Sequence, residues 1–126
     1  MRSKPKEVVE PILDEHRAHL RLDYRAQASL WVLGTLYQGE TRNISDGGLL
    51  FSTAQPLAPE LELQQWRVGR VTFALPHFTK PLQQDARIAW AVQRPELLTG
   101  VQFLHALPKV ALFVIAELRR RQLMGL

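Results

Sequence analysis

The chain has 126 residues, 46% of them hydrophobic, which suits one domain with an apolar core and argues against disorder. It contains no cysteine, so disulfides, thiolate metal sites and cysteine nucleophiles are excluded. The formal net charge of +4 favours an anionic partner, although such an excess is also common on ordinary solvated surfaces.

The N-terminal residues mix charges with apolar side chains and have no clear period. We therefore expect residues 1–15 to form an arm or a short helix, and residues 16–126 to form one domain. No apolar run approaches the roughly 20 residues that span a bilayer, and the basic start is not followed by the apolar stretch of a signal peptide. A cytoplasmic protein without membrane insertion is the expectation.

From residue 22 to residue 32, apolar and polar side chains alternate with the period of a half-buried strand. A second strand is expected through Leu36 and Tyr37. The stretch Asn-Ile-Ser-Asp-Gly-Gly at 43–48 then predicts a turn, because Asn, Asp and Gly tolerate left-handed backbone conformations. Short strands at this spacing are typical of an antiparallel barrel or sandwich. Further strands are expected at 49–51, 67–75, 86–92 and 100–104, with loops at 56–59 and around Pro95.

After Pro108 the apolar residues follow a helical period instead. Arg119, Arg120 and Arg121 fall in the last turns, where cations complement the helix dipole. The expected fold is therefore mainly β, with six or seven antiparallel strands followed by one C-terminal α-helix.

Two short motifs carry the functional signal. The first is Arg-x-x-x-Arg, formed by Arg17 and Arg21 directly before the first strand, and the second is Asn-x-Ser-x-x-Gly at 43–48. If the first two strands form a hairpin, the turn lies beside the arginine segment. Arginine presents a planar fork of donors suited to phosphate oxygens and to a guanine edge, and its guanidinium stacks on bases. The amide of Asn43 and the hydroxyl of Ser45 offer donors and acceptors for a base edge.

In these two motifs, in this order, the chain resembles the PilZ domain family, a bacterial receptor module for cyclic di-GMP. The resemblance continues through Ala86-Arg87-Ile88-Ala89-Trp90 and Thr99-Gly100-Val101-Gln102-Phe103, which look like late strands of the family, and through the final helix. It covers roughly residues 17–123. The fold it implies is a PilZ-type β-barrel with a C-terminal α-helix.

The resemblance also implies roles for individual residues. Arg17 and Arg21 would hold the phosphates and stack on or hydrogen-bond the guanines. Asn43 and Ser45 would read a guanine edge, and Gly48 would let the loop close on the ligand.

Four further residues bear on this ligand site. Trp90 stands where some relatives place an aromatic ring against a guanine, although packing is the other common role of an aromatic in a strand. Arg42 precedes the turn and would add positive charge. Arg25 also forms Arg-x-x-x-Arg with Arg21, but it falls inside the expected strand. His16 stands where many relatives carry a second basic residue, which leaves open whether one or two dinucleotides bind.

No catalytic pattern is evident. The serines lack a nucleophile elbow, and the pair His16 and His19 lacks the further ligands that a metal site needs. We therefore expect a non-enzymatic receptor without a cofactor, a monomer or homodimer, that binds cyclic di-GMP, changes the conformation of its N-terminal arm and signals to an effector protein. Two alternatives remain: an interaction adaptor of the same fold that binds no nucleotide, and a nucleic-acid-binding barrel. The second is disfavoured because aliphatic residues, rather than aromatic ones, dominate the alternation.

Overall fold

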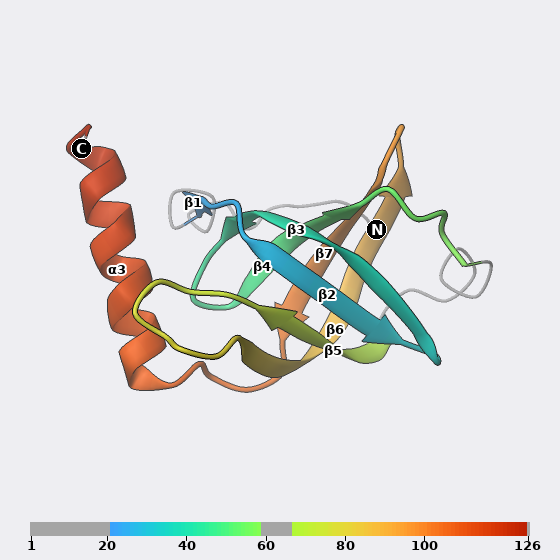
Figure 1. Cartoon of the computed structure of the whole chain (residues 1–126), viewed down its shortest axis with the longest axis horizontal. Coiled ribbons are helices and arrows are strands. Elements are labelled where there is room, and N and C mark those ends of the chain that lie inside the picture. Colours follow the sequence, from blue (N-terminus) through green and yellow to red (C-terminus); the bar gives the residue numbers. More distant parts are fainter. Residues whose placement is uncertain (1–20, 59–66, 126) are drawn as a thin grey trace, which may run out of the picture.

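The computed structural model describes residues 21–58 and 67–125, and the expected N-terminal arm lies outside them. The described chain forms seven strands and one helix (Figure 1). They are β1 (Leu22–Asp23), β2 (Gln27–Val32), β3 (Thr35–Ile44), β4 (Gly48–Thr53), β5 (Val68–Phe73), β6 (Leu82–Gln93), β7 (Leu97–Phe103) and α3 (Lys109–Leu123).

The sheet closes on itself. β3 pairs with β2 on one side and with β4 on the other, so the strands β3-β2-β5-β6-β7-β4 form a six-stranded antiparallel barrel. β1 pairs with the end of β3 as an additional strand. The predicted architecture, a mainly β barrel of six to seven strands with a C-terminal helix, is confirmed.

Period-two alternation along the strands fills the barrel interior. In β2 the side chains of Ala28, Leu30 and Val32 are buried, while Gln27 and Trp31, at alternate positions, are exposed. The rings of Phe73 and Phe103 stack inside, with their centroids 5.8 Å apart. The same alternation gives the barrel an outer face whose residues can be read from the strand register. The largest fully buried side chains are Tyr37, Phe51, Phe73, Leu22, Leu30, Ile44, Leu49, Ile88, Leu97, Ile115, Val32 and Val71.

The single strand predicted for residues 22–32 is interrupted at 24–26. Opposite this interruption, β3 has a bulge between Thr41 and Asn43, so β1 and β2 pair with β3 in registers that differ by one residue. A side chain takes over part of the ladder, because the backbone N–H of Ala26 donates to Thr41 Oγ1 at 3.0 Å. The sequence pattern does not reveal this break, since burial keeps its period through it.

Helix α3 begins directly after Pro108 and stands at one end of the barrel, beside β1 (Figure 1). Its buried residues Ala111, Val114 and Ile115 lie on one face. Near its C-terminus, the Gln122 amide donates to the carbonyl oxygen of Asp23 at 2.5 Å. The helix is thereby held against the strand that enters the candidate site.

Candidate ligand-binding site

The arginine segment and the turn motif meet at the start of the barrel. Arg21 immediately precedes β1, and in the β1–β3 ladder Asp23 lies opposite Asn43. The Arg21 guanidinium donates from Nη1 to Asn43 Oδ1 at 2.8 Å. The hairpin expected from the sequence therefore joins one arginine of the first motif to the first residue of the second. Arg17, the other arginine, lies outside the described residues.

The turn itself is held by internal hydrogen bonds. The N–H of Ser45 donates to the Gly48 carbonyl at 2.8 Å, and the N–H of Gly47 donates to Ser45 Oγ at 3.3 Å. The Ser45 hydroxyl lies 3.4 Å from the Gly48 carbonyl, and the residue is only 5% exposed. Ser45 thus shapes the turn, while its role in reading a guanine stays a prediction.

Gly48 is required by packing. A Cβ at this position would lie 2.2 Å from the carbonyl oxygen of Val101, on the neighbouring strand β7. By contrast, a Cβ at Gly47 would meet nothing within 4 Å. The close approach of β4 and β7 therefore accounts for the glycine at 48, and a ligand contact there stays a prediction.

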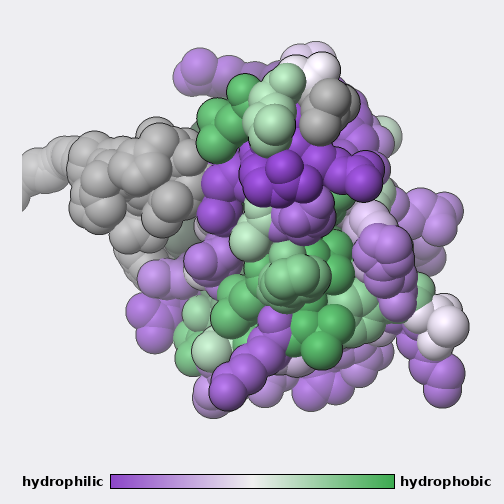
Figure 2. Space-filling model, turned by 90° about the vertical axis from the view of Figure 1, so that its left-hand side faces the viewer, coloured by the Kyte–Doolittle hydropathy of each residue, from purple (hydrophilic) through white to green (hydrophobic). Residues whose placement is uncertain are grey.

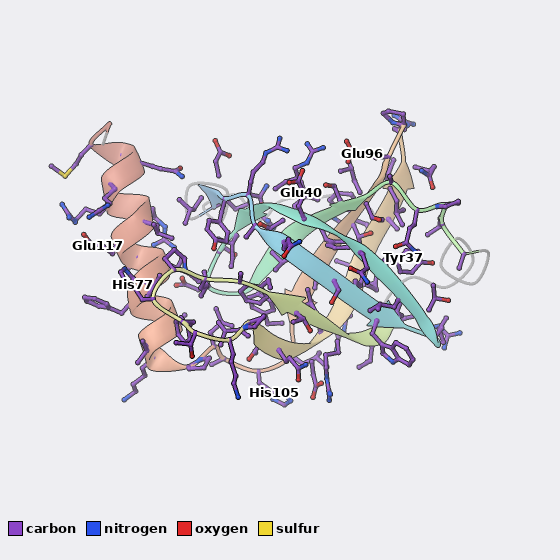
Figure 3. The ribbon with its side chains drawn as sticks, viewed as in Figure 1. Tyr37, Glu40, His77, Glu96, His105 and Glu117 are labelled. Carbon is purple, nitrogen blue, oxygen red and sulfur yellow. The ribbon has the colours of Figure 1, made fainter. Side chains whose placement is uncertain are left out.

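Arg42 is the extra residue of the β3 bulge, and its charge is matched by acidic side chains. Its Nη2 lies 2.5 Å from Glu96 Oε2, its Nε donates to Ser52 Oγ at 3.1 Å, and Glu40 lies 3.8 Å away (Figure 3 labels the two glutamates). With these partners Arg42 braces β3 against β4 and the β6–β7 hairpin. Its proposed contribution to a positive field is correspondingly reduced.

Arg25, the alternative arginine, is also paired. Its Nη1 lies 2.9 Å from Glu40 Oε2, although both side chains are well exposed. Asp23, Tyr24, Arg25, Arg42 and Asn43 together line an open cavity of about 380 Å³. Burial raises the pKa of Tyr24, whose hydroxyl donates to the Ala74 carbonyl at 2.6 Å. Tyr24 is therefore a neutral, structural member of this wall at physiological pH.

Trp90 lies on the same outer face as Asn43. The register runs directly across the barrel from Asn43 to Leu50, from Leu50 to Gly100, and from Gly100 to Trp90. Directly paired residues share a face, and Asn43 is separated from Trp90 by three strand spacings of about 4.8 Å each. The indole packs directly over Gly100, so closely that a Cβ added at Gly100 would lie 2.3 Å from Trp90 Nε1. Trp90 remains 40% exposed, so the side chain is packed against β7 on one side and partly open to solvent, while its contact with a ligand stays a prediction.

Arg87 joins this face, and the sequence reasoning assigned it no role. It pairs across the ladder with Gln102, which in turn pairs with Gly48. Residues three apart on a strand normally point to opposite faces, but a bulge between Ile88 and Trp90 puts Arg87 and Trp90 on the same side. No pattern in the sequence marks that bulge. Arg87 is exposed and adds a cation to the row that contains Gly48.

The turn is also tied to the helix. Asp46 Oδ1 lies 3.3 Å from Arg119 Nη2, and the Arg119 side chain is only 19% exposed.

In the described ranges 21–58 and 67–125, no group of three His, Cys, Asp or Glu side chains could hold a metal ion. Nor is any helix in that part of the chain long and apolar enough to cross a membrane.

A comparison with protein-family models matches residues 15–120 to the PilZ domain. The chain belongs to the PilZ domain family. PilZ domains serve as receptor and adaptor domains for cyclic di-GMP and are not enzymes. No curated protein matches the chain at a significant level.

A solved structure supports the PilZ fold. The Bacillus subtilis inhibitor of motility, MotI/DgrA, superposes with a TM-score of 0.66 at 18% sequence identity. The match covers 83% of this chain but only 50% of that protein. At this identity the likeness shows the shared fold, and the present chain spans half the length of the neighbour.

Proposed function

We propose that this PilZ domain is a receptor for cyclic di-GMP that binds the dinucleotide on the outer face of β3, β4, β7 and β6. The observation that carries the proposal is the 2.8 Å contact between Arg21 and Asn43, residues 22 apart in sequence that come from the two motifs. This contact puts a guanidinium beside an amide at one edge of a face that also carries Trp90. Such a face offers a cation for phosphates, polar groups for a guanine edge and a ring for stacking.

In this proposal each group has a distinct task. Arg17 and Arg21 hold the phosphates and contact the guanines, and Asn43 exchanges its bond with Arg21 for bonds to a base edge. Trp90 provides an aromatic platform about 14 Å across the barrel surface, at the far side of the same row. A dinucleotide with two bases suits a site whose polar and aromatic groups are separated in this way.

The signal follows from the position of the arginines. Both precede β1, so binding draws the leading segment of the chain over the outer face of the barrel. We propose that the altered segment presents a new surface to a partner protein. A receptor domain that binds its ligand in this way would act as a switch.

The test is a calorimetric titration of the purified protein with cyclic di-GMP. Parallel titrations with linear pGpG and with GTP measure the specificity. We expect Arg21→Ala to lose about 1.5–3 kcal/mol of binding free energy, which is tenfold or more in affinity. Arg70→Ala is the matched control, because Arg70 is another exposed arginine with a side-chain hydrogen bond, in its case to Asp85. Equal affinity of Arg21→Ala and Arg70→Ala would refute the assignment of Arg21.

A second candidate function is an interaction adaptor that binds no nucleotide. It is favoured by the internal partners of the motif residues: Asn43 is bonded to Arg21, the Ser45 hydroxyl is used within the turn, and Arg42 is paired with Glu96. A melting experiment separates the two candidates. A ligand present at 100 times its dissociation constant stabilises the folded state by about 2.7 kcal/mol, so cyclic di-GMP should raise the melting temperature of a receptor. The melting temperature of an adaptor without a nucleotide site should not change.

A further inference from the structure

Helix α3 exposes hydrophobic side chains at both ends of one face. Val110 and Phe113, near its start, are 62% and 71% exposed, and Met124, which caps its end, is 61% exposed. Spacings of three and fourteen residues place these side chains on one stripe, because a helix turns every 3.6 residues, or about 100° per residue. Figure 2 looks onto this side of the molecule and shows two hydrophobic areas separated by a hydrophilic band.

The band between them carries opposite charges in a fixed order. Glu117 Oε2 lies 2.5 Å from Arg120 Nη2 and 3.8 Å from Arg121 Nε. Glu117 points away from the barrel (Figure 3). The charged residues lie between Phe113 and Met124 at intervals of three or four residues, so they share the face of the helix that carries the hydrophobic ends. Read from its N-terminal end, the stripe is apolar, acidic, basic and apolar.

We infer that this stripe is a docking site for a second copy of the same chain, bound with the two α3 helices antiparallel. Two antiparallel helices related by a two-fold axis place residues level with each other when their residue numbers have the same sum. Phe113 therefore lies against Met124 of the second copy when Glu117 lies against Arg120 of the second copy. The two-fold axis repeats both contacts. A parallel arrangement would instead bring Glu117 against itself and the arginines against each other, which is repulsive. Charge complementarity therefore selects both the partner and the orientation.

The size of the stripe sets the strength of the contact. A helix of 15 residues is about 22 Å long, so the buried area falls at the small end of specific interfaces. We expect a reversible dimer whose population depends on protein concentration. The inference does not depend on nucleotide binding, and its test uses no nucleotide.

Sedimentation equilibrium of the full chain, over about 1 µM to about 1 mM, measures the dimer directly. Phe113→Glu should weaken dimerisation by about tenfold or more, because it puts a charge at the centre of an apolar contact. Leu36→Glu is the matched control: Leu36 is a 44% exposed apolar residue beside the β2–β3 turn, at the end of the barrel away from α3 (Figure 1). A parent protein that stays monomeric, or a dimer that Phe113→Glu leaves intact, would overturn the inference.

A charge exchange tests the antiparallel register. Glu117→Arg makes the band wholly basic, and the double change Arg120→Glu with Arg121→Glu makes it wholly acidic, so each variant alone should be monomeric. An equimolar mixture should restore the dimer, because each basic band then faces an acidic one. All three positions are exposed or half-exposed, so the variants should keep their circular dichroism spectra and cooperative melting. If either variant dimerises alone, or if the mixture stays monomeric, the proposed arrangement is wrong.

Discussion

Replacing Gly48 with alanine should destabilise the fold even when no ligand is present. The added methyl group would lie 2.2 Å from the Val101 carbonyl oxygen, far inside van der Waals contact. That oxygen belongs to the β7 backbone, where Gly48 pairs with Gln102, so it cannot retreat without stretching the β4–β7 ladder. Overpacking costs about 1–3 kcal/mol, and we expect at least about 2 kcal/mol here because the obstacle is backbone rather than a flexible side chain.

The neighbouring glycine provides a control with the same chemical change. Gly47→Ala meets nothing within 4 Å, so its free energy of unfolding should change by less than about 0.5 kcal/mol. Urea unfolding followed by circular dichroism gives the midpoint of each variant, and equal slopes show that the same surface is exposed on unfolding. If Gly48→Ala and Gly47→Ala unfold at the same urea concentration, the steric explanation for Gly48 is refuted. Loss of cyclic di-GMP binding in Gly48→Ala informs about the ligand only if that variant remains folded.

Three further changes test the contacts around the site. Asp46→Ala removes the ion pair with Arg119 and should cost at most about 1 kcal/mol, less at high salt, in melts at two ionic strengths, because Asp46 is largely exposed. Glu96→Ala leaves the partly buried Arg42 without its closest acid and should cost about 1–2 kcal/mol; a double-mutant cycle with Arg42→Ala measures the coupling. Burial raises the pKa of Tyr24 above its usual value of 10.0, so the stability that its neutral form contributes is complete below pH 10 and is lost as the pH rises through the folded-state pKa; unfolding of Tyr24→Phe should therefore depend less on pH above 10.

The barrel could be predicted because its determinants are local. Alternation in β2, the turn residues at 45–47 and the change to a helical period after Pro108 each act over a few residues, and each appears at the predicted place. The predicted hairpin also brought Arg21 to Asn43. Strand lengths were less accurate: β6 begins at Leu82, earlier than expected, because its first residues pair with β5 although they show no alternation of their own.

The composition of the outer face could not be predicted, because two bulges decide it. Without the bulge at Arg42, the period of two would turn Asn43 toward the barrel interior, on the same side as Thr41. Without the bulge before Trp90, Arg87 and Trp90 would lie on opposite faces. A bulge depends on how neighbouring strands fit together, so it leaves no local signal in the sequence. The ligand contacts of these residues remain predictions.

The bond between Arg21 and Asn43 has a consequence for how tightly a ligand can bind. A ligand that engages both groups must first open their 2.8 Å hydrogen bond, so its affinity reflects the difference between new and existing contacts. Arg21→Ala removes a ligand contact, but it also removes the cost of opening the bond to Asn43, so the net loss of affinity is smaller than the energy of the contact itself. Asn43→Ala removes the same cost. In a double-mutant cycle measured by calorimetry, the loss for the two changes together should therefore exceed the sum of the single losses. Additive losses would mean that the bond seen here is not the one that a ligand has to break.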